Sequence, residues 1–294
     1  MKPLARRLLT AARSAWFMQR KRGLRQRIRR CLGLSQDQDI QDILTYVANH
    51  PELELPLGMT PPYEWVNEYS SSKVLVEKED SSGLLYVIIN NHRVYFPRNA
   101  TLENVQDSVS IGLMEQDLRS PHRYVGDGFN VDAGDIGVFI GASDGLFCLS
   151  LLDRLSKAYL FEPNEDWHEP LRATFASWGD KVEIVPLAVG SRNDAKQVSL
   201  DYFFANRPVP QYIQVDVDGL ESDILKSGQR LLKNVTKLRL SLCTYHKRLD
   251  FPRFSEWLGN RGFTIAHSPG FYFLGVRKPF FRRGILYATK TPHE

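Results

Sequence analysis

Cysteine is scarce in this sequence, and its placement argues against two kinds of small-protein architecture. The three cysteines, Cys31, Cys148 and Cys243, are far apart and fit no metal-ligand spacing. A scattered, odd-numbered set of this kind suits neither a disulfide framework nor a structural zinc site. It suits a protein of a reducing compartment, so we expect a cytoplasmic location.

Long apolar runs are missing as well. No stretch approaches the ~20 apolar residues that a membrane-spanning helix requires. The N-terminus also lacks the apolar segment of a secretory signal. The composition is that of an ordinary globular protein, and 294 residues suffice for one large domain with a smaller appendage.

Acidic residues are absent from residues 1–34, which carry eleven lysines and arginines. The whole chain has a net charge of +4, so the other residues together carry −7. Leu4, Leu8, Ala11 and Ala15 recur at helical spacing, which predicts an amphipathic helix in this basic arm.

Four interpretations of the basic arm remain open. It suits a solvated helix that packs on the body of the protein, or on a second copy of the chain in a homo-oligomer. Trp16 and Phe17 would also suit a helix in peripheral contact with an anionic membrane. Nucleic-acid binding has only the electrostatic criterion in its favour. An arginine-rich, acid-free segment also describes a mitochondrial presequence.

Residues 35–125 predict a cap region in front of the main domain. Ser35-Gln36-Asp37-Gln38 has the pattern of a capping box that opens a helix. Residues 74–97 predict small strands with a turn at Asn90-Asn91, and Thr101 predicts the N-cap of a further helix. No residue of the cap indicates chemistry, but we expect the cap to shape an acceptor pocket.

Residues 126–294 alternate between strand and helix patterns, which predicts an α/β fold. Apolar strands joined by helices form a parallel, doubly wound sheet that is covered on both faces. The last two strand patterns predict a closing antiparallel pair. The predicted strands are 136–140, 158–161, 182–189, 212–217, 238–242, 263–266 and 285–288.

Polar and glycine-rich residues follow the first two strands. Gly141-Ala142-Ser143-Asp144-Gly145 leaves the first strand and enters a helix, where glycine permits a tight turn and close approach of a ligand. The spacing is not the G-x-G-x-x-G of dinucleotide-binding proteins, which argues against a nicotinamide-dependent oxidoreductase. Glu162, followed by Pro163, ends the second strand, where an acid accepts hydrogen bonds from ribose hydroxyls.

The fourth and fifth strands end at the same edge of the sheet. Asp216 ends the fourth strand, and Tyr245-His246 follows the fifth. Histidine is the best candidate for a general base near neutral pH, and a structural Tyr-His pair is the alternative. Asp216, Asp218 and Glu221 offer oxygen ligands for Mg²⁺, but three such acids more often divide between cofactor, turn and helix cap, so we predict no metal.

The ordered set of these motifs resembles the FkbM family of S-adenosylmethionine-dependent methyltransferases, from about residue 123 to residue 290. The resemblance is carried by Gly134-Asp135 before Gly141-Ala142-x-x-Gly145, by Phe161-Glu162-Pro163, and by Tyr245-His246. The run from Ile213 to Glu221 is similar to the family pattern I-K-I-D-V-E-G-x-E.

The resemblance implies a Rossmann-like seven-stranded sheet, S-adenosylmethionine as cofactor, and O-methylation of a hydroxyl on a sugar, polysaccharide or natural-product acceptor. The implied cofactor-binding residues come from the ends of three strands, and the implied catalytic residues from two. His246 is the expected base, with Asp216 as runner-up and Tyr245 beside it. The implied cofactor-binding residues are Gly141, Ala142, Ser143, Gly145, Glu162, Pro163 and Asp216.

The sequence departs from the family pattern at three positions. Phe139 stands where the family usually has an acid that helps to hold the amino end of the cofactor. Gln214 replaces a common lysine and Asp218 a common glutamate. Two alternatives therefore stay open: a non-catalytic, methyltransferase-like binding module, and a nucleic-acid methyltransferase guided by the basic arm.

Overall fold

The computed structural model describes residues 26, 28–30, 33–49, 63–274 and 280–292, so most of the basic arm and its predicted contacts lie outside the described residues. The chain divides into two compact units. The first comprises Met1–Asn67 with Gly270–Arg283, and the second comprises Glu68–Pro269 with Gly284–Glu294. The predicted segments 1–34, 35–125 and 126–294 divide the chain differently and stay a prediction.

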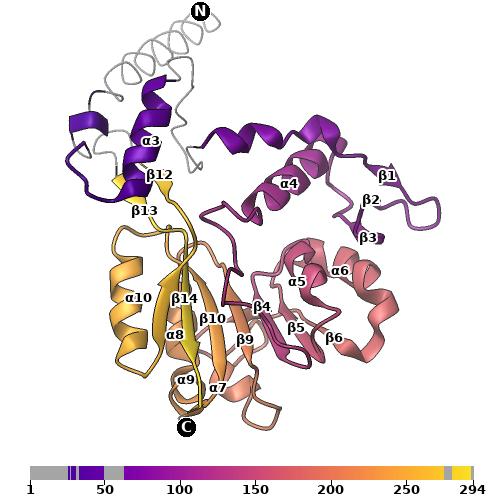
Figure 1. The fold of residues 1–294 in the computed structure, drawn as a ribbon. Coiled ribbons are helices and arrows are strands. Elements are labelled where there is room, and N and C mark those ends of the chain that lie inside the picture. The colour runs from indigo at the N-terminus through magenta and orange to yellow at the C-terminus, as the bar shows by residue number, and fades with distance from the viewer. Residues whose placement is uncertain (1–25, 27, 31–32, 50–62, 275–279, 293–294) are drawn as a thin grey trace, which may run out of the picture. The chain divides into compact units, whose positions relative to one another are not determined.

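The second unit is built on a seven-stranded sheet (Figure 1). In spatial order its strands are β11 (Thr264–His267), β14 (Ile285–Lys290), β10 (Leu238–Cys243), β9 (Tyr212–Val215), β4 (Ile136–Ile140), β5 (Lys157–Phe161) and β6 (Val182–Val185). The last five are parallel, and β14 is antiparallel to both of its neighbours. The predicted α/β fold with a closing antiparallel pair is confirmed.

Alternate residues of the central strands face two different helical layers. Val138 and Ile140 belong to one core, with Phe203 and Ile224 from helices on that side. Phe139 points the other way and packs edge-on against Phe147. Burial on both faces explains why these strands are apolar throughout. The helices are α5 (Leu146–Leu151), α6 (His168–Phe175), α7 (Leu200–Phe203), α8 (Glu221–Ser227), α9 (Gln229–Asn234) and α10 (Asp250–Gly259).

The middle of the sheet is a topological switch point. The strand β4 pairs with β5, the next parallel strand in the sequence, on one side and with the much later β9 on the other. Ile140 is in register with Val215, so the chain leaves both strands at the same level. Ligands of doubly wound sheets bind outside the strands at such a point.

The third predicted strand, 182–189, is too long. The chain pairs with β5 only over β6, and Ala188–Val189 forms β7 of a separate small sheet with β8 (Gln197–Val198). Pro186 has no backbone N–H for a sheet ladder, and Leu187 N instead bonds back to Val185 O at 2.8 Å.

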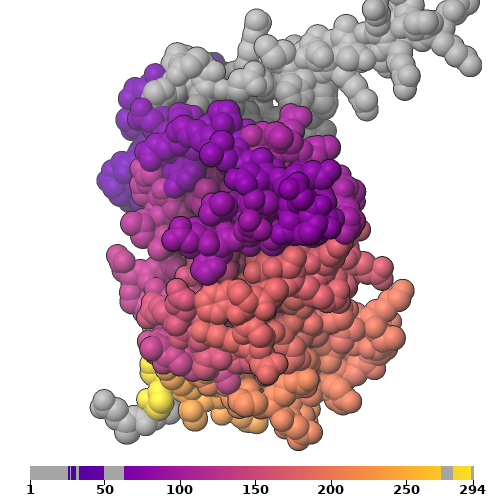
Figure 2. Space-filling model, turned by 90° about the vertical axis from the view of Figure 1, so that its right-hand side faces the viewer, coloured from indigo at the N-terminus to yellow at the C-terminus, as the bar shows by residue number. Residues whose placement is uncertain are grey.

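A small antiparallel sheet and a long helix precede the large sheet. The strands β1 (Glu77–Lys78), β2 (Leu85–Ile89) and β3 (His92–Tyr95) confirm the predicted small strands. Asn90 and Asn91 both have positive φ (49° and 65°), as the predicted hairpin turn requires. In Figure 2 this violet sheet lies against the salmon-coloured α6, where the Thr174 hydroxyl accepts a bond from Tyr95 N.

The helix α4 (Leu102–Glu115) follows that sheet and begins with the predicted Thr101 cap. The Thr101 side chain accepts a hydrogen bond from Asn104 N, and the Asn104 side chain accepts one from Thr101 N, so a reciprocal capping box is present. Two 3₁₀ turns lie before β1, at Glu64–Glu68 and Ser71–Lys73, and two flank α6, at Glu165–Trp167 and Ala176–Lys181.

The first unit contains α3 (Gln38–Asn49), β12 (Tyr272–Leu274) and β13 (Phe280–Arg282). Its core joins Ile28, Ile43, Val47 and Phe271. The predicted capping box at Ser35 is not formed as expected, because the helix begins at Gln38 and the Ser35 hydroxyl bonds to Asp37 N. Among the described residues, no helix has both the length and the apolar character needed to cross a membrane.

Replacing Gly141 with alanine is expected to lower the free energy of unfolding by at least ~2 kcal/mol. Gly141 has φ +80°, and a Cβ built there would lie 1.9 Å from the carbonyl oxygen of Asp216. Gly259→Ala is the control, because a methyl group at that position would meet nothing within 4 Å and alanine favours a helix. Urea denaturation of both variants measures the difference, and equal stabilities would contradict the close approach at Gly141.

Candidate functional site

A tight turn follows β4 and touches the end of β9. The backbone amides of Gly141 and Ala142 both bond to Phe161 O, at 3.0 and 3.2 Å, which ties the turn to β5 as well. The turn needs positive φ at Gly141, Ser143 and Gly145. A Cβ at Gly145 would come within 2.7 Å of the Phe175 ring. The predicted glycine loop is therefore a turn packed between three strand ends.

Glu162 connects this turn to the segment after β5. One carboxylate oxygen accepts a hydrogen bond from Ser143 N at 2.8 Å, and the other accepts one from Asn164 N at 2.9 Å. Glu162 is 7% exposed, and it lines a cavity together with Pro163. The carboxylate is thus fixed in place by backbone donors, beside a space that a ligand can enter.

Two cavities meet at this edge of the sheet. The first, of about 490 Å³, is bordered by Glu162, Pro163 and Leu187, and we call it the Glu162 cavity. The second, of about 300 Å³, lies between α4 and the turn after β4, and we call it the α4 cavity. Gly141, Ser143 and Asp216 line both, so the cavities adjoin.

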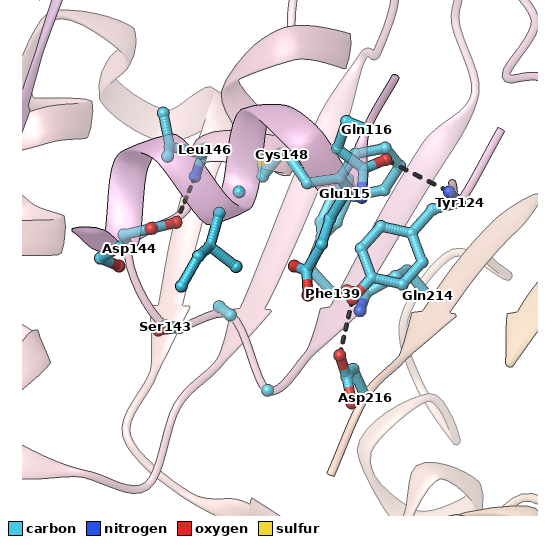
Figure 3. Close-up of a pocket in the computed structure, with 16 residues that line it drawn as sticks. Glu115, Gln116, Tyr124, Phe139, Ser143, Asp144, Leu146, Cys148, Gln214 and Asp216 are labelled. Carbon is cyan, nitrogen blue, oxygen red and sulfur yellow. Dashed lines mark hydrogen bonds between the residues drawn. The ribbon is translucent and has the colours of Figure 1, made fainter. Parts of the chain in front are cut away.

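Asp216 lies where the two cavities meet and is held by three neighbours. Its Oδ2 accepts a hydrogen bond from the Tyr124 hydroxyl at 2.7 Å and lies 3.3 Å from His122 Nε2 (Figure 3 draws the first contact). The Tyr245 hydroxyl donates to Oδ1 at 3.4 Å. Burial alone would raise the pKa of Asp216, but His122, the Tyr124 hydroxyl and His246 hold it well below the ordinary range.

His122 forms a buried bridge between two acids. It is 2% exposed, with Nε2 2.9 Å from the Tyr245 hydroxyl and Nδ1 3.6 Å from Glu115 Oε2. Burial by itself lowers the pKa of His122, but the carboxylates of Glu115 and Asp216 outweigh it and raise the pKa. The two carboxylates therefore stabilise the protonated form of His122 relative to a histidine buried without them.

His246 lies on the opposite side of Asp216 and is oriented by a buried acid. Its Nδ1 is 2.8 Å from Glu221 Oε1, and its Nε2 is 3.6 Å from Asp218 Oδ1 and 3.9 Å from Asp216 Oδ1. Partial burial lowers the pKa of His246, but Glu221 and the two aspartates raise it overall. The Tyr245 ring packs on the imidazole, with the centroids 4.2 Å apart.

The structure brings the predicted site residues together, although their roles stay predictions. Residues of the turn (Gly141, Ala142, Ser143, Gly145), Glu162, Pro163, Asp216, Tyr245 and His246 all come from the carboxyl edge of β4, β5, β9 and β10. Phe139 does not fill the α4 cavity but borders it, because its ring packs beside Phe147 and Tyr212.

Three residues near the site were missed by the sequence analysis: Glu115, His122 and Tyr124. They precede β4 and lie in the segment predicted to be a cap without chemistry. The available signal was a histidine and a tyrosine placed close together, Pro121-His122-Arg123-Tyr124, immediately before the region of the resemblance. Without knowledge of the fold, nothing paired that segment with Asp216.

Asp216, Glu221 and His246 also present one ligand atom each within 4.8 Å of one another. Such a set has the donors of a divalent-cation site. The same arrangement is also explained without a metal, as a histidine held by a carboxylate, because His246 Nδ1 lies 2.8 Å from Glu221 Oε1. The absence of a metal stays a prediction.

No protein-family model matches the chain, and no curated protein matches it in sequence. Among solved structures, the methyltransferase FkbM of Methylobacillus flagellatus is 16% identical, with a TM-score of 0.46 over 64% of this chain. That match spans 53% of the Methylobacillus chain, about half its length.

Two further solved structures are similar at comparable levels. A precorrin-6Y C5,15-methyltransferase of Geobacter metallireducens is 11% identical, with a TM-score of 0.38 over 64% of this chain and 89% of its own. An rRNA methylase of Streptococcus thermophilus is 15% identical, with a TM-score of 0.39 over 55% of this chain and 90% of its own.

The partly buried carboxyl of Asp144 is expected to make stability depend on pH. Burial raises the pKa of Asp144 to about 6, partly offset by the bond from Leu146 N to its Oδ1. Because the folded state keeps this proton longer than the unfolded chain, the contribution of Asp144 to stability falls as pH rises from about 4 to about 6. In Asp144→Asn the loss is absent.

We therefore expect the stability of Asp144→Asn, relative to wild type, to grow by about 1–3 kcal/mol between pH 4 and pH 7. Urea denaturation at a series of pH values measures this difference. A difference that stays constant over the range would contradict the buried placement of the carboxyl.

Proposed function

We propose that this protein is an S-adenosylmethionine-dependent methyltransferase, related to the FkbM family, that methylates a hydroxyl of a sugar, polysaccharide or natural-product acceptor. One observation carries the proposal. A carboxylate fixed by two backbone amides, Glu162, faces a cavity that continues past the turn after β4 to Asp216. This is the arrangement that an adenosine-containing molecule needs at a switch point.

The residues fit the proposed cofactor piece by piece. Each carboxylate oxygen of Glu162 is engaged by one backbone amide and retains acceptor capacity for a ribose hydroxyl. Leu187 and Pro163 offer apolar surface in the same cavity, where a purine ring would lie. Gly141, Ser143 and Asp216 border both cavities, so the rest of the cofactor would pass these residues into the α4 cavity.

When bound, S-adenosylmethionine would supply a methyl group activated by its sulfonium; an acceptor oxygen would attack that methyl carbon in line, the carbon–sulfur bond would break, and the thioether S-adenosylhomocysteine would leave. The protein therefore has to align the reacting atoms, and such alignment is worth ~7–11 kcal/mol in favourable cases. Asp216, kept ionised by His122 and Tyr124, would provide a fixed negative charge for the cationic sulfonium of a bound cofactor.

The acceptor hydroxyl must also lose its proton, and His246 is the residue proposed to take it. The neighbours of Asp216 lower its pKa and make it a weaker base, whereas those of His246 raise its pKa, which makes the neutral form of His246 the stronger base. Glu221 holds Nδ1 and leaves Nε2 turned toward Asp216 and Asp218. The proton of the hydroxyl would pass to Nε2 as the new oxygen–carbon bond forms.

Ligand binding tests the first part of the proposal. We expect S-adenosylhomocysteine to bind the wild-type chain in calorimetry, and Glu162→Gln to weaken binding at least ~10-fold, because one acceptor oxygen is lost. Glu165→Gln is the matched control, since Glu165 is exposed and does not line the cavity. No binding at millimolar ligand would favour the alternative of a non-catalytic binding module.

Methyl transfer tests the base. With labelled cofactor and a panel of sugars and hydroxylated natural products, His246→Ala is expected to slow transfer by ~10²–10⁴-fold. It should change the affinity for S-adenosylhomocysteine less than ~3-fold. His267→Ala is the control, because His267 is exposed on β11.

Two results would assign His246 differently. Undiminished transfer by His246→Ala would show that another group takes the proton. Loss of wild-type transfer with a chelator, restored by Mg²⁺, would show that the His246, Asp216 and Glu221 set holds a cation.

A further inference from the structure

The α4 cavity is lined by acids without a basic partner on its wall. Glu115 enters it from α4, Asp144 from the turn after β4, and Asp216 from the end of β9. Figure 3 labels these three acids, which lie apart from one another among the residues that line the cavity. Among the described residues that line this cavity, none is a lysine, arginine or histidine. A cavity of this kind favours a ligand group that carries positive charge.

Two of the three acids already have donors. Asp216 accepts from Tyr124 and lies beside His122 at 3.3 Å, and Asp144 accepts from Leu146 N at 2.9 Å. Glu115 is less well compensated. Its closest described ionic contact is the 3.6 Å separation from His122 Nδ1, which is longer than a hydrogen bond, and burial raises its pKa. Its side chain keeps 24% of its surface exposed.

The position of Glu115 fixes which end of a ligand it can meet. The α4 cavity and the Glu162 cavity share Gly141, Ser143 and Asp216. A molecule whose ribose is held by Glu162 therefore reaches Glu115 with its opposite end. In the proposed cofactor, that end carries a primary ammonium group. Phe139 contributes only a ring to the same wall, so it supplies no charge there.

We propose that the carboxylate of Glu115 binds the α-ammonium group of the cofactor, and so selects amino-acid-bearing adenosyl ligands. This inference rests on the proposed function. An ammonium group would give Glu115 a charge-assisted hydrogen bond within a partly desolvated wall, where such bonds are strong. Recognition of the amino end thus comes from helix α4, outside the strands that hold the rest of the ligand.

A ligand-by-variant cycle tests the contact directly. The probes are S-adenosylhomocysteine, its analogue without the amino group, and its analogue without the carboxylate. In the wild-type chain, removing the amino group should raise the Kd about 10-fold to 100-fold. In Glu115→Gln the same removal should change the Kd less than ~3-fold, because the charged partner is gone. The analogue without the carboxylate should lose affinity on Glu115→Gln as S-adenosylhomocysteine does.

The controls separate the contact from a folding effect. Asp107→Asn changes an exposed acid on the same helix that does not line the cavity, and its Kd values should equal those of the wild type. Glu115→Asp keeps the charge on a shorter side chain and should keep part of the preference for the amino group. The melting temperature of each variant without ligand reports whether α4 is intact.

The outcomes also distinguish the inference from the function on which it rests. If the wild-type chain binds none of the probes, the proposed function fails. If the wild type binds them but Glu115→Gln keeps the full preference for the amino group, the function stands and the role of Glu115 is overturned. Loss of that preference in folded Glu115→Gln supports the contact.

Discussion

The close approach of two strand ends determines the shape of this site. Gly141 lies so near the carbonyl of Asp216 that no side chain fits between the turn after β4 and the end of β9. Two parallel strands are thereby joined at one level, and the space above them is divided into two adjoining cavities. The same constraint explains why one carboxylate, Asp216, borders both cavities, and why a ligand that spans them must pass it.

The two histidines near Asp216 differ in their burial and in the acids that contact them. His122 lies between Glu115 and Asp216 and does not line the α4 cavity. Its charged neighbours are therefore these two carboxylates rather than a ligand in the cavity. His246 occupies the other side, where Glu221 orients it and where it retains 17% exposure of its side chain. The buried histidine therefore stabilises the nearby carboxylates, while the partly exposed one is the proposed proton acceptor.

The parts of the site that the sequence predicted are those that depend on strand order. Gly141, Glu162, Asp216 and His246 each follow or end an apolar run, and parallel strands bring such ends to one edge whatever the intervening chain does. The length of the third strand was overestimated because residues 182–189 form one largely apolar segment, although the strand ends before Pro186. The pattern of residues 270–283 gave no indication that they belong to the first compact unit.

Glu115, His122 and Tyr124 were beyond sequence reasoning for a different reason. They lie about a hundred positions before Asp216, and no periodicity relates them to it; only the tertiary contacts of α4 and of the segment that follows it do. The same packing bears on Phe139. A negative charge that holds a ligand group has to lie at the right position in the cavity, and any segment of the chain that borders the cavity can provide it. A carboxylate on a covering helix can therefore supply what an apolar strand residue does not, and an apolar Phe139 is no argument against ligand binding once Glu115 borders the same cavity.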